Sequence, residues 1–266
     1  MFHSPQKIAE ISIESGLKKS QMSLGTLLIL GFFAGAFIAF GFLLDIRVTA
    51  GNPTTMPGFN SFLGASVFPI GLILTILAGG ELLTGNMMTL PIAWFAKKIS
   101  FGAVIKNWVI ILIANFIGSI FVAYFFGHVA GLTSSGIFLD KMVAIAQAKV
   151  AQPFGPAFVS AFGCNWLVCL AVWLAYGSQD MGSKIFAIWF PIMAFVAIGF
   201  QHVVANMYVI PSAIFEGKMT WGQYFPNFFA VLLGNIVGGA IFVGLAYFVA
   251  YKKDLAVAQD GAKKVA

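Results

Sequence analysis

Six long stretches of apolar residues run along the chain, and short polar connections separate them. Several windows of 18 or more residues hold almost no charge, and a helix of that length crosses about 30 Å of hydrocarbon. The pattern predicts an all-α integral membrane protein. Its spanning units are expected at about 24–44, 62–95, 103–127, 156–176, 185–215 and 222–250.

The second and fifth units are too long for one crossing. A continuous helix over 62–95 would extend about 50 Å at ~1.5 Å per residue. We therefore expect both helices to be broken halfway, where protein or a wet cavity satisfies the freed backbone groups. Glu81 or Thr84 is expected to cap exposed amides at the first break, and for Glu81 this structural role outweighs one in transport. The residues expected to form that break are Gly79, Gly80, Glu81, Gly85 and Asn86.

An internal repeat recurs at an offset of 120 residues. The segment "GNMMTLPIAWFAKKISFG" (85–102) aligns with "ANMYVIPSAIFEGKMTWG" (205–222), and the same offset pairs Asn115 with Asn235. Upstream, the match fits only at an offset of 128, because the first connecting loop is the longer one.

Each repeat contains three spans, an odd number, so the second copy enters the membrane from the opposite side. Two inverted three-helix repeats, about 24–128 and 156–250, are typical of channels and secondary transporters. We expect one transmembrane domain over residues 1–266, with an amphipathic surface helix in 1–23 and a cytoplasmic tail in 251–266.

Composition and charge set the environment and the orientation. Hydrophobic residues make up 60% of the chain and charged residues 9%, whereas soluble domains carry about 25% charged residues. The net charge of +6 is concentrated at span ends and tails, which indicates topology rather than nucleic-acid binding. Eleven lysines fall on the side that carries both termini, and four basic residues fall on the other. The protein is expected in the plasma membrane with both termini cytoplasmic.

A single histidine, His202, falls in the second break, within "GFQHVVANMYVIPS" (199–212). A histidine in an apolar run is usually a satisfied core group. This one lies at the level of its repeat mate Leu82 and next to Thr84, where the two breaks should meet, so we expect it to face a pore. A neutral imidazole can donate to a small anion without a permanent charge, and its unperturbed pKa of about 6.5 also permits proton transfer.

Two other classes of function are weighed against anion transport. Asn86 and Asn206, at repeat-related half-helix starts, are compatible with a neutral-solute pore of the aquaporin type, but neither lies in an Asn-Pro-Ala triplet. A membrane-bound enzyme would need a metal cluster or a nucleophile with its base. No HExxH or GxSxG pattern occurs, so no enzymatic activity, cofactor or metal is expected.

Three segments resemble the formate/nitrite transporter family, which also includes hydrosulfide channels: "AGGELLTGN" (78–86), "FGCNWLVCLAVW" (162–173) and "GFQHVVANMYVIP" (199–211). The likeness covers nearly the whole chain. It implies a six-span, aquaporin-like protomer assembled as a homopentamer, with one pore per protomer.

Carried over to this sequence, the central histidine of the family is His202, the threonine of its interrupted helix is Thr84, and its vestibule lysine is Lys149. Asn165 and Asn206 are expected beside the same pathway. Many relatives have an acidic residue directly before the histidine, whereas this chain has Gln201. The matching positions for the apolar pore constriction are Phe68, Leu72, Leu83, Val168 and Phe195.

Together with these residues, the resemblance implies a channel or transporter for small monovalent anions of weak acids, with formate first and nitrite or hydrosulfide as alternatives. Burying a bare anion costs several kcal/mol or more, whereas the neutral acid crosses at a lower cost. Lys149 would concentrate the anion by attraction. The proton could come from bulk water, through the vestibule or from His202. The sequence leaves these sources open.

Overall fold

The computed structural model describes residues 2–52 and 55–255, and within them the fold is entirely helical, with no β-sheet. The predicted all-α class is confirmed. Of the expected tail, residues 256–266 lie outside the described part of the chain. The elements are α1 (Pro5–Ser20), α2 (Leu24–Thr49), α3 (Pro57–Val67), α4 (Ile70–Leu74), η1 (Thr75–Gly79), α5 (Leu83–Phe95), α6 (Phe101–Phe121), η2 (Val122–Val129), α7 (Gly136–Val150), α8 (Phe154–Gly177), α9 (Met181–Ile198), α10 (Val203–Phe215), α11 (Trp221–Ile236), η3 (Val237–Leu245) and α12 (Ala246–Ala250).

Six helices in the described residues are long and apolar enough to cross a membrane, as the sequence predicted. They are Leu24–Thr49, Pro57–Gly79, Phe101–Val129, Phe154–Gly177, Met181–Ile198 and Trp221–Ala250. The first loop is shorter than expected, because α2 continues to Thr49 and α3 begins at Pro57, a proline in the first turn, where its missing N–H costs nothing.

The second and fifth helices are broken, as predicted. Gly79 (φ 98°) and its repeat mate Gly199 (φ 84°) end the first halves in the left-handed conformation that favours glycine. The second halves, α5 and α10, have 13 residues each, about 20 Å, which is too short to span a bilayer. Residues 83–93 and 203–213 are buried throughout. The half-helices therefore form the centre of the molecule.

Two corresponding close contacts relate the halves of the fold. α2 packs along α6, and α8 packs along α11 and its continuation η3. A Cβ at Gly118 would collide with the carbonyl of Phe32, and a Cβ at Gly238 with the carbonyl of Phe162. Glycine thus allows both pairs of backbones to approach. Since Phe32 and Phe162 are 130 positions apart, the expected upstream offset of 128 is wrong by two residues.

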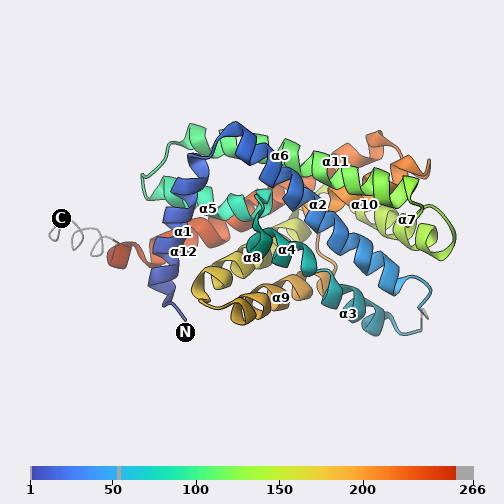
Figure 1. The fold of residues 1–266 in the computed structure, drawn as a ribbon, viewed down its shortest axis with the longest axis horizontal. Helices are drawn as coiled ribbons and strands as arrows, with labels where there is room; N and C mark the ends of the chain where they lie inside the picture. Colours follow the sequence, from blue (N-terminus) through green and yellow to red (C-terminus); the bar gives the residue numbers. More distant parts are fainter. Residues whose placement is uncertain (1, 53–54, 256–266) are drawn as a thin grey trace.

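Two of the helices outside the six spans, α1 and α7, lie at opposite ends of the long axis of the bundle (Figure 1). α1 crosses one end, near the N-terminus and α12, and α7 lies at the other. α1 is the predicted amphipathic helix, with Ile8 and Ile13 buried against the bundle. α7 carries Lys149 in its last turn.

Candidate functional site

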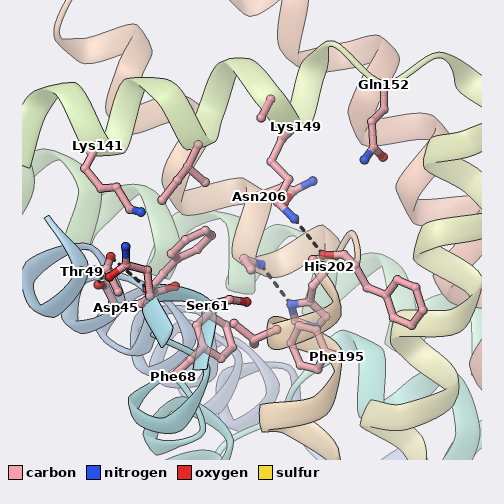
Figure 2. Close-up of a pocket in the computed structure, with 18 of the residues that line it drawn as sticks. Asp45, Thr49, Ser61, Phe68, Lys141, Lys149, Gln152, Phe195, His202 and Asn206 are labelled. Carbon is pink, nitrogen blue, oxygen red and sulfur yellow. Dashed lines mark hydrogen bonds between the residues drawn. The ribbon is translucent and has the colours of Figure 1, made fainter. Parts of the chain in front are cut away.

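Three cavities lie in a row through the molecule. The first, which we call the α7 vestibule, has a volume of about 510 Å³ and includes Lys141 and Lys149 of α7 in its lining (Figure 2). The second, the α1 vestibule, measures about 380 Å³ and is lined partly by Lys19 of α1. Between them is a cavity of about 10 Å³, which is room for a single water-sized probe.

Shared lining residues connect the three cavities. Phe68, Phe195 and His202 line both the α7 vestibule and the small cavity. Leu72 and Leu82 line both the small cavity and the α1 vestibule. The arrangement is two wide mouths, each with charged side chains in its lining, joined through a narrow apolar centre.

The small cavity contains four of the five predicted constriction residues: Phe68, Leu72, Val168 and Phe195. The fifth, Leu83, is not among its lining residues, and Leu82 takes this place. Leu82 is in extended backbone before α5, whereas Leu83 is already the first helical residue and packs in the core. Sequence reasoning missed Ile38 and Ile192, which complete the lining.

Aromatic rings seal the small cavity on the side of the α7 vestibule. The ring centroid of Phe68 lies 5.6 Å from that of Phe42 and 5.7 Å from that of Phe195. The Phe195 ring lies 5.7 Å from the imidazole of His202. The two contacts between phenylalanine rings are edge-to-face, a geometry that aromatic pairs favour, so they stabilise the apolar lining at this point.

The two breaks meet at a hydrogen bond between His202 and Thr84. The distance from His202 Nε2 to Thr84 Oγ1 is 2.9 Å, across 118 positions of sequence. His202 is also the N-cap of α10, because its Nδ1 accepts from the amide of Ala205 at 3.1 Å. A nitrogen that accepts carries no proton, so the neutral imidazole has its hydrogen on Nε2. The sequence predicted this meeting, although Thr84 itself is fully buried.

The expected capping by Glu81 or Thr84 is wrong. The first amide of α5, on Leu83, donates to Oδ1 of Asn115 at 2.9 Å, and the first amide of α10, on Val203, donates to Oδ1 of Asn235 at 2.9 Å. The asparagines are repeat mates on α6 and α11. The repeat had paired them, and an amide within an apolar span was the signal that could have assigned them this role.

Each of these asparagines also donates twice to the backbone. Asn115 Nδ2 donates to the carbonyls of Gly31 (2.7 Å) and Glu81 (2.9 Å). Asn235 Nδ2 donates to those of Ala161 (2.7 Å) and Gln201 (3.2 Å). One side chain therefore ties together three segments, which satisfies the backbone at membrane depth.

A second set of repeat mates surrounds each break. Asn86 Nδ2 donates to Glu81 (2.9 Å) and Asn107 (3.0 Å). Asn206 Nδ2 donates in the same way to Gln201 (2.7 Å) and to Asn227 (2.9 Å). The expected place of Gly85 in the first break is wrong, because α5 already begins at Leu83 and Gly85 lies inside this helix.

The two breaks differ in charge. Glu81 forms an ion pair of 2.6 Å with Lys19 of α1, and both side chains are largely buried. Its repeat mate Gln201 instead donates through Nε2 to the carbonyl of Lys149 at 3.0 Å. The Nζ of Lys149 donates to the carbonyl of Phe200 at 2.8 Å. Among the described residues no carboxylate lies within 4 Å of this ammonium, and burial lowers the pKa of Lys149 to about 8.

The remaining predicted pathway residues, both buried, are placed differently from each other. Asn206 lines the α7 vestibule. Asn165 is not among the lining residues of these cavities; its Nδ2 donates to the carbonyls of Asn235 (2.7 Å) and Thr84 (3.2 Å). Asn165 therefore stabilises the backbone beside the first break by its hydrogen bond to Thr84.

The chain matches the family model described as "Formate/nitrite transporter" over residues 6–249. It is 58% identical over 252 residues to "Uncharacterized transporter YrhG" of Bacillus subtilis (strain 168), covering 95% of each chain. It is 56% identical over 252 residues to "Formate channel BtFdhC" of Bacillus thuringiensis, covering 95% of this chain and 97% of that one.

Solved structures show the same fold. The "FNT family ion channel" superposes with a TM-score of 0.85 at 29% identity, over 92% of this chain and 98% of that one. The "Pentameric formate channel with formate bound" superposes with a TM-score of 0.76 at 30% identity, over 86% of this chain and 97% of that one.

Proposed function

Because the chain belongs to the formate/nitrite transporter family, whose members are membrane transporters and channels rather than enzymes, we propose that it is a channel for small monovalent anions of weak acids, with formate as its first substrate. The single observation that carries the proposal is the row of cavities: two vestibules with charged side chains in their linings meet at an apolar centre whose one polar lining residue is His202. The relative from Bacillus thuringiensis is itself named a formate channel.

The apolar centre favours passage of the neutral acid. Moving a bare anion past Phe68 and Phe195 into a cavity of about 10 Å³ would strip its hydration at a cost of several kcal/mol or more. The same low dielectric raises the pKa of the approaching acid, since it disfavours the charged form. Lys149 attracts the anion to the α7 vestibule, and protonation there removes the charge before the constriction.

The geometry of His202 favours bulk water in the vestibule as the proton source over the imidazole itself. In the neutral ring Nδ1 accepts from Ala205 and the one proton lies on Nε2. Giving up that proton would leave an imidazolate, while holding a second proton on Nδ1 would break the N-cap of α10. His202 therefore serves as a fixed hydrogen-bond donor to the passing molecule or to Thr84.

Formate flux into liposomes tests the proposed function. Purified protein in liposomes should admit labelled formate faster than protein-free liposomes, with saturation and with a rate that increases as the external pH falls. Uptake no faster than in protein-free liposomes across the pH series would reject the proposal.

Two variants of His202 test its role. His202→Asn offers an oxygen to cap α10 and an N–H to donate, without a titratable proton, so its flux should retain the wild-type pH dependence. His202→Leu removes both the N-cap of α10 and the N–H donor of the imidazole. Its flux should fall about tenfold or more, because a hydrogen bond is lost in a buried site. Both are measured in the same liposome assay. Loss of pH dependence in His202→Asn would contradict the vestibule as proton source.

Nitrite and hydrosulfide are also conjugate bases of weak acids, and the same path would serve them. A panel of the three anions at equal concentration and pH ranks them by initial uptake rate. Water permeability in the same liposomes tests the neutral-solute alternative, which predicts osmotic flow that formate does not inhibit.

Assembly and orientation complete the proposal. We expect a homopentamer, as in the related structure titled a pentameric formate channel, with one pore in each protomer. The distribution of lysines favours both termini in the cytoplasm, which directs the α7 vestibule outward. Native mass spectrometry of the detergent-solubilised protein measures the subunit number.

A further inference from the structure

An acidic residue that the sequence analysis did not single out lines the α7 vestibule. Asp45 lies on α2, one turn beyond Phe42, and both residues line the cavity. In Figure 2 Asp45 and Thr49 lie across the cavity from His202. The space for the carboxylate depends on Gly64 of α3, since a Cβ there would collide with Oδ1 of Asp45.

This carboxylate is loosely held. Its one hydrogen bond to another side chain in the described residues is a long one of 3.4 Å, donated by the hydroxyl of Thr49, and no lysine or arginine in that part of the chain lies within 4 Å of it. The acid of the α1 vestibule differs, because Glu81 is fixed by Lys19 at 2.6 Å and by Asn86 at 2.9 Å. The carboxylate of the α1 vestibule is thus held by two short polar contacts, whereas Asp45 of the α7 vestibule has one long hydrogen bond and lines a cavity that water can enter.

The charged groups facing Asp45 come from α7. Lys141 and Lys149 line the same cavity, and Figure 2 shows both extending from that helix. α3 contains no charged residue. On α2 itself, Arg47 is turned away, with its guanidinium bonded to the carbonyl of Leu132 and stacked on Phe138. His202 is the remaining titratable group of the lining, and it belongs to the far wall.

We propose that Asp45 is the pH-responsive residue that sets how strongly the α7 vestibule captures anions. When ionised it offsets one of the two lysines and weakens the attraction for the anion. When protonated, at low external pH, it leaves both lysine charges unopposed, and the anion concentrates at the aromatic constriction just as protons become available. The inference rests on the proposed function, because it concerns capture of the same anion by the same path.

The test is the apparent KM for formate uptake from the α7 side, measured over a pH series. Proteoliposomes whose C-terminal tag is accessible from outside are removed on an affinity resin, which leaves those with the α7 vestibule facing outward. Asp45→Asn keeps the size of the side chain and removes its charge, so at neutral pH its KM should be about threefold lower than that of the wild type, the effect of one unit charge acting through a partly wet cavity. As the pH falls and wild-type Asp45 is protonated, the two KM values should converge.

Two further variants separate the charge of Asp45 from other effects. Asp140→Asn makes the same change of charge on an exposed residue of α7 outside the cavity lining, and its KM should match the wild type. Lys141→Gln removes a positive charge from the lining and should raise the KM by a similar factor. This opposite effect keeps the proposal testable even if Asp45→Asn does not assemble.

The failures of the two proposals are distinguishable. Wild-type uptake with equal KM values for Asp45→Asn and wild type at every pH would overturn the role of Asp45 alone. Loss of uptake by Asp45→Asn at low pH would also overturn it, since that outcome makes the carboxyl a proton donor. No formate uptake by the wild type would reject the proposed function, and this inference with it.

Discussion

At the scale of single residues, burial lowers the pKa of Lys149, although its side chain still lines the α7 vestibule. Lys149 lines the α7 vestibule, donates to the carbonyl of Phe200 and has no carboxylate of the described residues within 4 Å of its ammonium. Desolvation disfavours the ammonium, which lowers the pKa of Lys149 to about 8. The attracting charge is therefore present at neutral pH and is lost as the pH rises through about 8.

Because the charge of Lys149 is lost as the pH rises through about 8, lysine and arginine at this position should differ in the pH dependence of formate uptake. Lys149→Arg keeps its charge at every accessible pH. Between pH 7 and pH 9 the wild-type KM for formate should rise about threefold relative to that of the variant, because only about one-tenth of a group with a pKa of about 8 is charged at pH 9. Dividing the KM of the wild type by that of the variant at each pH cancels the effect of pH on the ionisation of formate itself. A ratio that does not change with pH would show that Lys149 does not titrate in this range.

At the scale of elements, broken helices need partners from outside themselves. The first amides of α5 and α10 have no carbonyl of their own helix to bond. Asn115 and Asn235 supply an acceptor for these amides and two donors for nearby carbonyls. At membrane depth no water replaces such bonds. The asparagines thus convert an interrupted helix into a fixed structure.

Removing either asparagine should therefore destabilise the protein to a similar extent. Asn115→Ala and Asn235→Ala each leave one buried amide and two buried carbonyls without these bonds, at a cost of about 3 kcal/mol or more. Thermal unfolding of the purified protein in detergent measures the loss. Asn52→Ala, which removes one bond to the carbonyl of Val48, is the control and should change the stability by less than about 1 kcal/mol. Unequal losses at the repeat mates would contradict their equivalence.

At the scale of the whole molecule, α1 is attached to the bundle at the mouth of the α1 vestibule. Ser15 shares a hydrogen bond of 2.8 Å with Tyr176 of α8, and Lys19 reaches Glu81 in the first break. The surface helix is therefore connected to the same carboxylate that fixes Asn86. α7 has the corresponding position at the opposite end, where the backbone carbonyl of Lys149 accepts from Gln201 and Asn227.

The ion pair predicts a non-additive result in a double-mutant cycle. Lys19→Gln leaves a buried carboxylate without its counter-charge and should cost about 3 kcal/mol. Glu81→Gln reproduces the amide of the second break and should cost less. The double variant should recover much of the loss, with a coupling energy of about 1–3 kcal/mol from thermal unfolding. Additive losses would mean that the pair contributes nothing to docking of α1.

Much of the architecture was determined by the sequence alone. Six crossings and two broken helices follow from hydrophobicity along the chain, and counting the spans predicts that the two repeats are inverted. The place of His202 in the second break also follows, because its position relative to Thr84 depends on the repeat offset. These features are linear: a span must be apolar, and a unit too long to cross once must be interrupted.

Only the tertiary structure decided which atoms satisfy the breaks and which side chains face the path. Asn115 bonds an amide 32 positions away, Lys19 pairs with a carboxylate 62 positions away, and Leu82 rather than Leu83 lines the small cavity. The exposure of Asp45 to the α7 vestibule depends on space beside Gly64 of another helix. The physical reason is that hydrogen-bond partners and cavity linings are fixed by how helices pack and rotate, which the hydrophobic pattern constrains only to a face and not to a single residue.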